Sequence, residues 1–256
     1  MSALRRRVMP CLLLDGEGLV KTVNFKSATY IGDPINAIRI FNELEVDELI
    51  LLDIMASDKD MRPDFEIINK VASECFMPLT YGGGIKSVGD ADNLFRIGIE
   101  KISLNSALFE QAELLPQISQ KYGSQAVVAS IDVLKNMFGK YHVYRERGRK
   151  KTNESPLNWA LKLQELGAGE ILLTSINHEG TWDGFDLKLI EELASALSIP
   201  VIANGGAGNA EDLRSALKQG NASAVTAGSM FVFQKKGMGV LINYPPQNII
   251  EQIIAK

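Results

Sequence analysis

Apolar runs of strand length recur along the chain, and most of them lack an alternation of polar and apolar positions. Continuous apolar runs of this length are typical of parallel strands that are buried on both faces. They therefore predict a parallel sheet with both faces covered. The runs cover residues 7–14, 48–54, 78–82, 101–105, 125–133, 169–176, 199–204 and 222–227.

Amphipathic stretches of helical length lie between these runs. Residues 35–44 are one example, and residues 156–166 are another, which Ser155 and Pro156 introduce with the residues of a helix start. Eight strands that alternate with eight helices predict a single α/β domain, a (β/α)₈ or TIM barrel, over residues 1–256.

Two insertions lengthen this alternation. Residues 15–32 follow the first strand, and residues 134–152 follow the fifth strand with a hairpin-like pattern at 135–144. Both leave from carboxyl ends of strands, the face on which barrel enzymes build their active sites. We therefore expect both insertions to lie near the functional site.

The chain also repeats itself at an offset of 122 residues. Pro78 corresponds to Pro200 (200 − 78 = 122), and Gly98 corresponds to Gly220 (220 − 98 = 122). A repeat of half the chain with the same order of strands and helices indicates two similar halves. We expect a two-fold half-barrel repeat with a boundary near residue 122.

Each half contains a strand that runs directly into glycines and then into a helix. The glycines are residues 82–84 in the first half and residues 205–206 in the second. Glycines after a strand let backbone N–H groups approach a phosphate, and the start of the following helix adds its positive dipole end. The repeat thus predicts two phosphate-binding sites.

Composition and charge narrow the class of protein. The chain has 46% apolar and 23% charged residues and a net charge of −4, which is ordinary for a globular protein and argues against a nucleic-acid binder. Cys11 and Cys75 are the only cysteines, which favours reduced thiols in a cytoplasmic protein over a disulfide framework. Residues 1–15 resemble a signal peptide only superficially, because Pro10 interrupts their apolar run. No run reaches the roughly 20 apolar residues of a membrane span.

Polar side chains at the ends of apolar strands are candidates for chemistry. Asp132 ends the fifth strand, where a carboxylate is costly unless it is solvated or hydrogen-bonded, so it is a candidate acid or base. The alternative is that Asp132 only caps the next loop, and the same two interpretations hold for Asp53. His142 and His178 are too few and too far from the cysteines to form a metal site. The glycine runs lack the spacing of a dinucleotide site, so we expect neither a metal nor another cofactor.

Motifs along essentially the whole chain resemble the cyclase subunit of imidazole glycerol phosphate synthase. The resemblance implies a TIM barrel with a bis-phosphorylated ribonucleotide substrate, which fits two phosphate sites. It also implies a heterodimer with a glutaminase subunit, docked at the amino-terminal face of the barrel, whose ammonia passes through the barrel core. The motifs are residues 7–12, 21–25, 32–34, 52–54, 82–85, 123–125, 148–150, 167–175 and 205–208.

The resemblance assigns roles to two groups of residues. Four charged residues at the starts of strands one, two, four and six match the family's ammonia gate; a plain salt-bridge plug is the alternative. They are Arg7, Glu48, Lys101 and Glu170. The expected substrate- and phosphate-binding residues are Lys21, Gly83, Gly84, Asn105, Ser106, Thr174, Asn204, Gly205, Gly206, Gly228 and Ser229.

The chain departs from the family pattern at the catalytic pair. The family uses aspartates at the ends of strands one and five, and here Asp132 is kept while Leu13 replaces the other. Leucine cannot transfer a proton, and Asp15 lies roughly 6–7 Å further along the strand. Asn177 and Glu179 stand where the family usually has aspartate, and Asn204 replaces a serine of the second phosphate site.

These observations favour a diverged paralogue of the cyclase subunit that hands ammonia from a glutaminase to a separate amidotransferase of surface-polysaccharide sugars. An active cyclase, which forms imidazole glycerol phosphate and AICAR ribonucleotide and has moved its acid-base function to Asp15 or Glu179, is the alternative. A regulatory phosphosugar-binding barrel and the related sugar isomerase are further candidates, and the gate residues argue against both.

Overall fold

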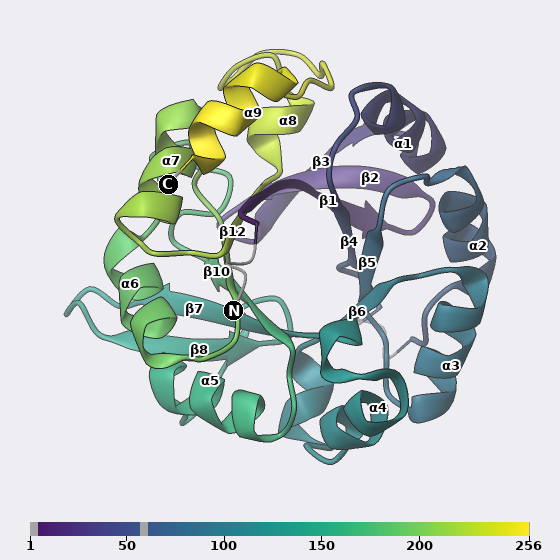
Figure 1. The fold of residues 1–256 in the computed structure, drawn as a ribbon, viewed down its shortest axis with the longest axis vertical. Coiled ribbons are helices and arrows are strands. Elements are labelled where there is room, and N and C mark those ends of the chain that lie inside the picture. The colour runs from purple at the N-terminus through teal and green to yellow at the C-terminus, as the bar shows by residue number, and fades with distance from the viewer. Residues whose placement is uncertain (1–4, 57–60, 256) are drawn as a thin grey trace.

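The computed structural model describes residues 5–56 and 61–255 and confirms the predicted barrel. Eight parallel strands form a closed ring, and helices surround it (Figure 1). The ring strands are β1 (Arg7–Asp15), β4 (Leu49–Asp53), β5 (Leu79–Gly82), β6 (Lys101–Leu104), β7 (Val127–Lys135), β10 (Glu170–Ser175), β11 (Val201–Asn204) and β12 (Ala224–Ala227).

The strands follow one another around the ring in chain order. Each pairs in parallel with the next, β12 pairs with β1, and β7 pairs with β10. Because all strands run the same way, their carboxyl ends meet at one end of the barrel and their amino ends at the other. Every expected strand is present, with its bounds shifted by at most two residues.

Helices cover the outside of the ring. Side-chain caps start several of them: the Asp33 carboxylate accepts from the Asn36 N–H, and Ser155 accepts from the Asn158 N–H. After β12 the chain forms two helices instead of the single one expected. The helices are α1 (Pro34–Glu43), α2 (Phe65–Glu74), α3 (Val88–Ile97), α4 (Leu114–Tyr122), α5 (Pro156–Glu165), α6 (Leu187–Ala196), α7 (Ala210–Lys218), α8 (Ser229–Val232) and α9 (Gln247–Ile254), with short 3₁₀ turns η1 (Ser106–Phe109) and η2 (Ser124–Ala126).

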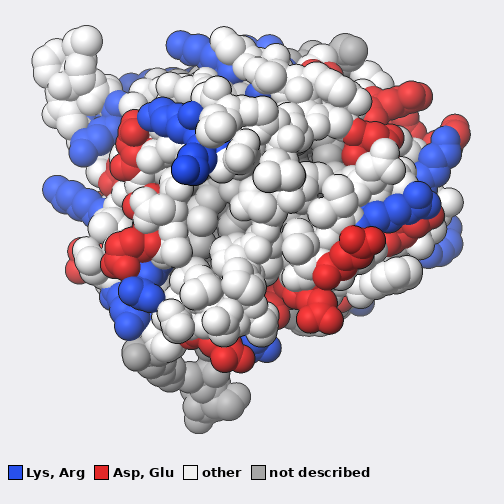
Figure 2. Space-filling model, turned by 90° about the horizontal axis from the view of Figure 1, so that it is seen from above, with Lys and Arg blue, Asp and Glu red and all other residues white. Residues whose placement is uncertain are grey.

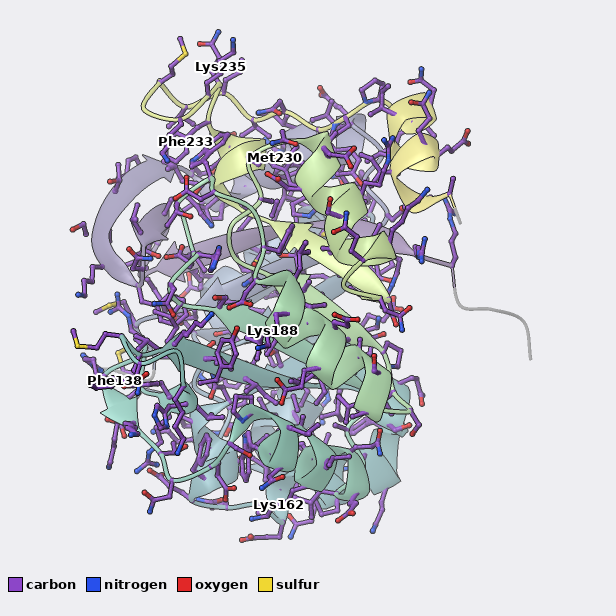
Figure 3. All side chains as sticks on the ribbon, turned by 90° about the vertical axis from the view of Figure 1, so that its left-hand side faces the viewer. Phe138, Lys162, Lys188, Met230, Phe233 and Lys235 are labelled. Carbon is purple, nitrogen blue, oxygen red and sulfur yellow. The ribbon has the colours of Figure 1, made fainter. Side chains whose placement is uncertain are left out.

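The last helix, α9, packs on the outside of the ring next to β1 (Figure 1). The buried Tyr244 hydroxyl, just before α9, donates to the Val8 carbonyl over 2.8 Å. Figure 3 shows α5 and α6 over the neighbouring side of the ring, with Lys162 and Lys188 on them. Figure 2 looks onto the side that carries α9 and α1; the middle of this face is uncharged, and no basic stripe crosses it.

Both insertions form antiparallel strands at the carboxyl end of the barrel. Strands β2 (Gly18–Val23) and β3 (Lys26–Gly32) form a hairpin that pairs with the end of β1. Strands β8 (Tyr141–Arg145) and β9 (Lys150–Lys151) extend the end of β7, as the hairpin-like pattern predicted. Phe138 lies at the tip of this second arm, with 89% of its surface exposed (Figure 3).

The hydrophobic core has two parts. The larger one lies between the strands and the helices, and a smaller apolar layer fills the inside of the ring. That inner layer consists of Met9, Cys11, Ile50, Val128, Leu172, Ile202 and Ala224. Cys11 and Cys75 are free thiols. Within the described residues, no helix is long and apolar enough to cross a bilayer.

Candidate functional site

A cavity of about 500 Å³ opens at the carboxyl end of the barrel. Strand ends from all around the ring contribute to its wall, and the β2–β3 hairpin covers part of its mouth. Every residue expected to bind substrate or phosphate lines this cavity. They are Lys21, Gly83, Gly84, Asn105, Ser106, Thr174, Asn204, Gly205, Gly206, Gly228 and Ser229, together with Leu13 and Asp132.

The first glycine turn follows β5 and leads toward α3. Gly83 and Gly84 have φ angles of +123° and +69°, a range that side chains with a Cβ disfavour. A Cβ on Gly84 would also lie 2.9 Å from the Met61 carbonyl oxygen. The turn thus has no room for side chains, and both glycines line the cavity, where their backbone N–H groups suit phosphate oxygens.

The second glycine turn has the same character. Gly205 and Gly206, after β11, have φ angles of +94° and +115°. Gly228 follows β12, and Ser229 begins the short helix α8 directly after it. A Cβ on Gly228 would collide with the Lys21 ammonium group, so glycine is required for the lysine to lie at this position.

Lys21 places a cation beside Gly228, after β12. Only 6% of its surface is exposed, and its ammonium donates to the Cys11 carbonyl over 3.3 Å. Burial raises the pKa of the nearby Glu179 carboxyl group, and the Lys21 charge opposes that rise through space. A buried ammonium beside bare backbone N–H groups favours an anionic ligand group.

Asp132, at the cavity wall, is held by its two neighbouring strands. The side-chain amide of Asn105, directly after β6, donates to its Oδ2 over 2.8 Å, and the Thr174 hydroxyl on β10 also contacts it. Burial raises the pKa of Asp132 to about 7, the Glu179 charge adds to this, and the Asn105 and Thr174 bonds oppose it. A carboxyl group with this pKa exchanges protons near neutral pH, as a general acid or base requires.

Asn204 links Thr174, which contacts Asp132, to Thr226 on the adjacent strand β12. Its Nδ2 donates to Thr174 Oγ1 over 3.1 Å, and its Oδ1 accepts from Thr226 Oγ1 over 3.2 Å. Both ends of the Asn204 amide are therefore engaged with neighbouring strands. The side chain at this position braces the wall of the cavity.

Leu13 places an aliphatic group on the β1 side of the cavity, with 9% of its surface exposed. Asp15, the residue considered as a substitute, pairs with Gly18 at the base of the hairpin and is not part of the cavity wall. Glu179, the other substitute, does line the cavity, and burial raises its pKa. Of the two carboxylates, only Glu179 shares a cavity with Asp132.

Asp53 also lines the cavity, but its bonds serve the adjacent turn. Its Oδ1 accepts from the Met55 and Ala56 N–H groups over 2.9 and 3.1 Å. Burial is the largest influence on its carboxyl group and raises the pKa. These are the contacts of a residue that caps the loop after its strand, which is one of the two interpretations considered for Asp53.

The four charged residues of the predicted gate meet at the amino end of the barrel. Arg7 bridges Glu48 and Glu170, with N–O distances of 2.9 and 3.1 Å. Lys101 bridges the same two carboxylates, each over 3.2 Å. The result is a closed ring of alternating charges, whose side chains are only 12–16% exposed. This charge ring closes the inside of the barrel opposite the cavity.

Hydroxyl groups belong to the inner wall of the cavity. Ser103, Ser130 and Thr226 line it, and Ser103 and Ser130 form a hydrogen bond of 2.8 Å. The inner apolar layer of the barrel is uncharged. No cluster of metal-ligating side chains occurs among residues 5–56 and 61–255.

The sequence did not reveal how the hairpin and the loop after β10 hold one another. Thr22 and Phe25 contact the Glu179 side chain, and the residues concerned are more than 150 positions apart. The loop stood out in the sequence only through its departure from the family pattern. No local pattern signals such a long-range contact.

Comparison with known proteins gives consistent matches. A family model described as "Histidine biosynthesis protein" matches residues 7–236. A Pseudomonas aeruginosa protein named "Putative imidazole glycerol phosphate synthase subunit hisF2" is 52% identical over 248 residues, 97% of this chain and 99% of that protein. A Vibrio vulnificus protein with a name of the same form, ending in hisF3, is 44% identical over 94% of both chains. "Imidazole glycerol phosphate synthase subunit HisF" of Chlorobaculum tepidum is 43% identical, over 90% of this chain and 92% of its own.

Proposed function

The chain belongs to the histidine biosynthesis protein family, and on that premise we propose that it is a cyclase-like subunit that accepts ammonia from a partner glutaminase. In this proposal the subunit has diverged to deliver the ammonia for the amidation of a sugar in surface-polysaccharide biosynthesis. The proposed complex is a heterodimer with the glutaminase at the amino end of the barrel. A sugar amidotransferase is the proposed recipient of the ammonia.

The contrast between the two ends of the barrel carries this proposal. At the amino end the charge ring is complete, with each cation bonded to both carboxylates. At the carboxyl end one of the two acid-base positions holds Leu13. A protein that lacks one of the two proton-transfer groups but keeps the charge ring is suited to pass a small molecule on rather than to cyclise a ribonucleotide.

The charge ring fits a gate because its charges are buried. Removing four charged groups from water is costly, and a barrel core is usually filled by apolar side chains. Arg7 and Lys101 occupy places where aliphatic residues would pack without that cost. Displacing one cation would open the centre of the ring while the other still pairs with both carboxylates.

The interior beyond the charge ring suits ammonia. Ammonia is small and neutral, so it enters an apolar layer more readily than ammonium or other hydrated ions. The paired hydroxyls of Ser103 and Ser130, which line the cavity, offer it a donor and an acceptor there.

The cavity retains the features of a phosphate site. Two glycine turns line it, and the buried Lys21 ammonium lies beside Gly228 after β12. We propose that a phosphorylated small molecule binds here through the backbone N–H groups and Lys21. Asp132 then binds the ligand instead of serving in a proton-transfer pair, since position 13 holds a leucine, which cannot transfer a proton.

An isotope experiment tests the delivery of ammonia. The chain is reconstituted with its glutaminase and a sugar amidotransferase, and glutamine carrying ¹⁵N in its amide is supplied together with excess unlabelled ammonium. We expect the amidated sugar to keep the label, because ammonia that passes through the barrel does not mix with the solution. The Lys101→Met variant should dilute the label. Full dilution with the wild-type chain would refute delivery through the barrel.

Retained cyclase activity is the second candidate, and one observation favours it. Glu179 lines the same cavity as Asp132, and its charge raises the pKa of Asp132. Two carboxyl groups that influence each other are the arrangement of an acid-base pair. Ammonium-dependent turnover that disappears in Glu179→Gln would support this alternative.

A further inference from the structure

The β2–β3 hairpin turns through only two residues, Asn24 and Phe25. Val23 pairs with Lys26, and the two turn residues have φ angles of 51° and 62°. Two left-handed residues in succession define a turn that normally prefers Asn-Gly. Asn24 suits its position, but a phenylalanine at the second position is disfavoured by its Cβ. This turn therefore needs support from outside the hairpin.

The support comes from the loop after β10, through the Glu179 side chain. Its Oε1 accepts from the Thr22 hydroxyl over 2.9 Å, and its Oε2 accepts from the Phe25 backbone N–H over 2.9 Å. Both oxygens of one carboxylate are thus used on the same hairpin. Glu179 is 7% exposed, so these bonds are shielded from water.

Backbone contacts align the two segments around that carboxylate. The Asn24 N–H donates to the Glu179 carbonyl over 2.9 Å, and the Asn24 side chain donates to the carbonyls of Ile176 and Asn177 over 2.9 and 2.8 Å. Gly180 has a φ angle of +73°, and a Cβ there would collide with the Thr22 carbonyl. The hairpin and the loop are packed too closely to admit a side chain between them.

The hairpin forms part of the cavity wall. Lys21, Thr22 and Phe25 all line the cavity, and the Phe25 ring lies 3.1 Å from the place of a Cβ on Gly148 in the other insertion. Phe25 therefore extends across the mouth between the two insertions. Any movement of the hairpin would carry Lys21 away from Gly228.

We propose that Glu179 is a positioning residue that latches the β2–β3 hairpin as a lid over the cavity and thereby fixes Lys21 for an anionic ligand. The inference rests on the proposed phosphate site for its ligand, but the latch itself is a property of the fold. It gives Glu179 a role other than proton transfer.

The length and shape of the side chain decide whether the latch closes. An aspartate is shorter by one C–C bond of about 1.5 Å and cannot reach Thr22 and Phe25 together. A glutamine has the same length; its Oε1 can accept from the Phe25 N–H while its Nε2 donates to Thr22 Oγ1. The Glu179→Gln variant thus removes the charge but keeps the latch, which separates a positioning role from an acid-base role.

Hydrogen exchange at single amides, measured by NMR, tests the latch. In Glu179→Ala we expect the Phe25 amide to exchange about 10–100-fold faster, the range for losing a hydrogen bond to a charged group. Glu179→Asp should behave in the same way, and Glu179→Gln should keep the protection of the wild type. Glu191→Gln, on the exposed face of α6, is the matched control.

Binding of inorganic phosphate, measured by calorimetry, tests the consequence for Lys21. We expect affinity to fall about tenfold in Glu179→Ala and to stay the same or rise in Glu179→Gln, because the lid remains closed and a negative charge is removed. Unchanged Phe25 protection in Glu179→Ala, or lost protection in Glu179→Gln, would overturn the latch. Absence of phosphate binding by the wild type would count against the proposed function, while the exchange experiment would still decide the latch.

Discussion

Replacing Asp132 by asparagine is predicted to stabilise the protein at pH 8 and to have no effect near pH 4. The pKa of Asp132 is raised from 3.8 to about 7, chiefly by burial. Because the folded-state value lies above the unfolded one, the unfolded chain loses this proton first as the pH rises. Stability therefore falls between about pH 4 and pH 7, and the deficit persists above pH 7.

The size of the effect follows from the shift. About three pKa units at 1.36 kcal/mol each give an upper limit of about 4 kcal/mol. Since Asp132 faces a cavity that admits water, we expect about half of this, or about 2 kcal/mol, at pH 8. For a chain of this size that corresponds to roughly 4–8 °C in the thermal midpoint. Asparagine keeps the shape and can still accept from Asn105.

Thermal midpoints of the wild type and Asp132→Asn, measured by calorimetry between pH 4 and pH 8.5, provide the assay. The Asp92→Asn variant is a control in which the pH dependence of the stability difference should have the opposite sign, because a hydrogen bond from Lys121 lowers the pKa of Asp92. The reasoning would be refuted if Asp132→Asn were less stable than the wild type at pH 8, or if the difference did not depend on pH.

Three other substitutions test different parts of the molecule. Arg7→Met should leave Glu48 and Glu170 facing each other with a single cation and lower stability by about 3 kcal/mol, or roughly 6–12 °C, in a calorimetric scan; an unchanged midpoint would contradict the buried charge ring. Phe25→Gly should relieve the left-handed strain and keep the N–H donor, yet widen the cavity mouth, so a dye that the wild-type hairpin excludes should bind in the cavity; continued exclusion of the dye would contradict the placement of Phe25 across the mouth. Gly83→Ala should weaken phosphate binding about tenfold or more, since its φ of +123° does not suit alanine; unaltered affinity in calorimetry would exclude the first glycine turn as a phosphate site.

The strands of the barrel could be predicted because each is a continuous apolar run buried on both faces. Ile171, Leu172 and Leu173 on β10 show this well, since side chains that point into the ring and those that point toward the helices are equally buried. The split into α8 and α9 was not predicted, because the intervening residues 233–246 carry no strong periodicity. The two-fold repeat, with a boundary near residue 122, stays a prediction.

The β2–β3 hairpin was harder to foresee. Most of β3 is exposed, so it has no buried face to produce an alternating pattern. Its turn contains Asn24 and Phe25 instead of an Asn-Gly pair, so the strongest hairpin signal is missing. Contacts with the loop after β10, far away in the sequence, explain why this turn is stable.

Much of the site could be located from the sequence because barrel geometry gathers strand ends. Once Asp132, Asn105 and Thr174 are placed at the ends of adjacent strands, their proximity follows from the parallel pairing. The bridging role of Asn204 could not be inferred, since it depends on side-chain conformation. The biochemical roles assigned to these residues remain predictions.

Ammonium-dependent turnover of the bis-phosphorylated cyclase substrate is the most direct test of the central claim, that the barrel has lost cyclase chemistry at one position. We predict no turnover by the wild type, turnover in Leu13→Asp, and its loss again when Asp132→Asn is added to Leu13→Asp. Robust turnover by the wild type that Asp132→Asn abolishes would contradict the account and place the missing acid-base group on another residue.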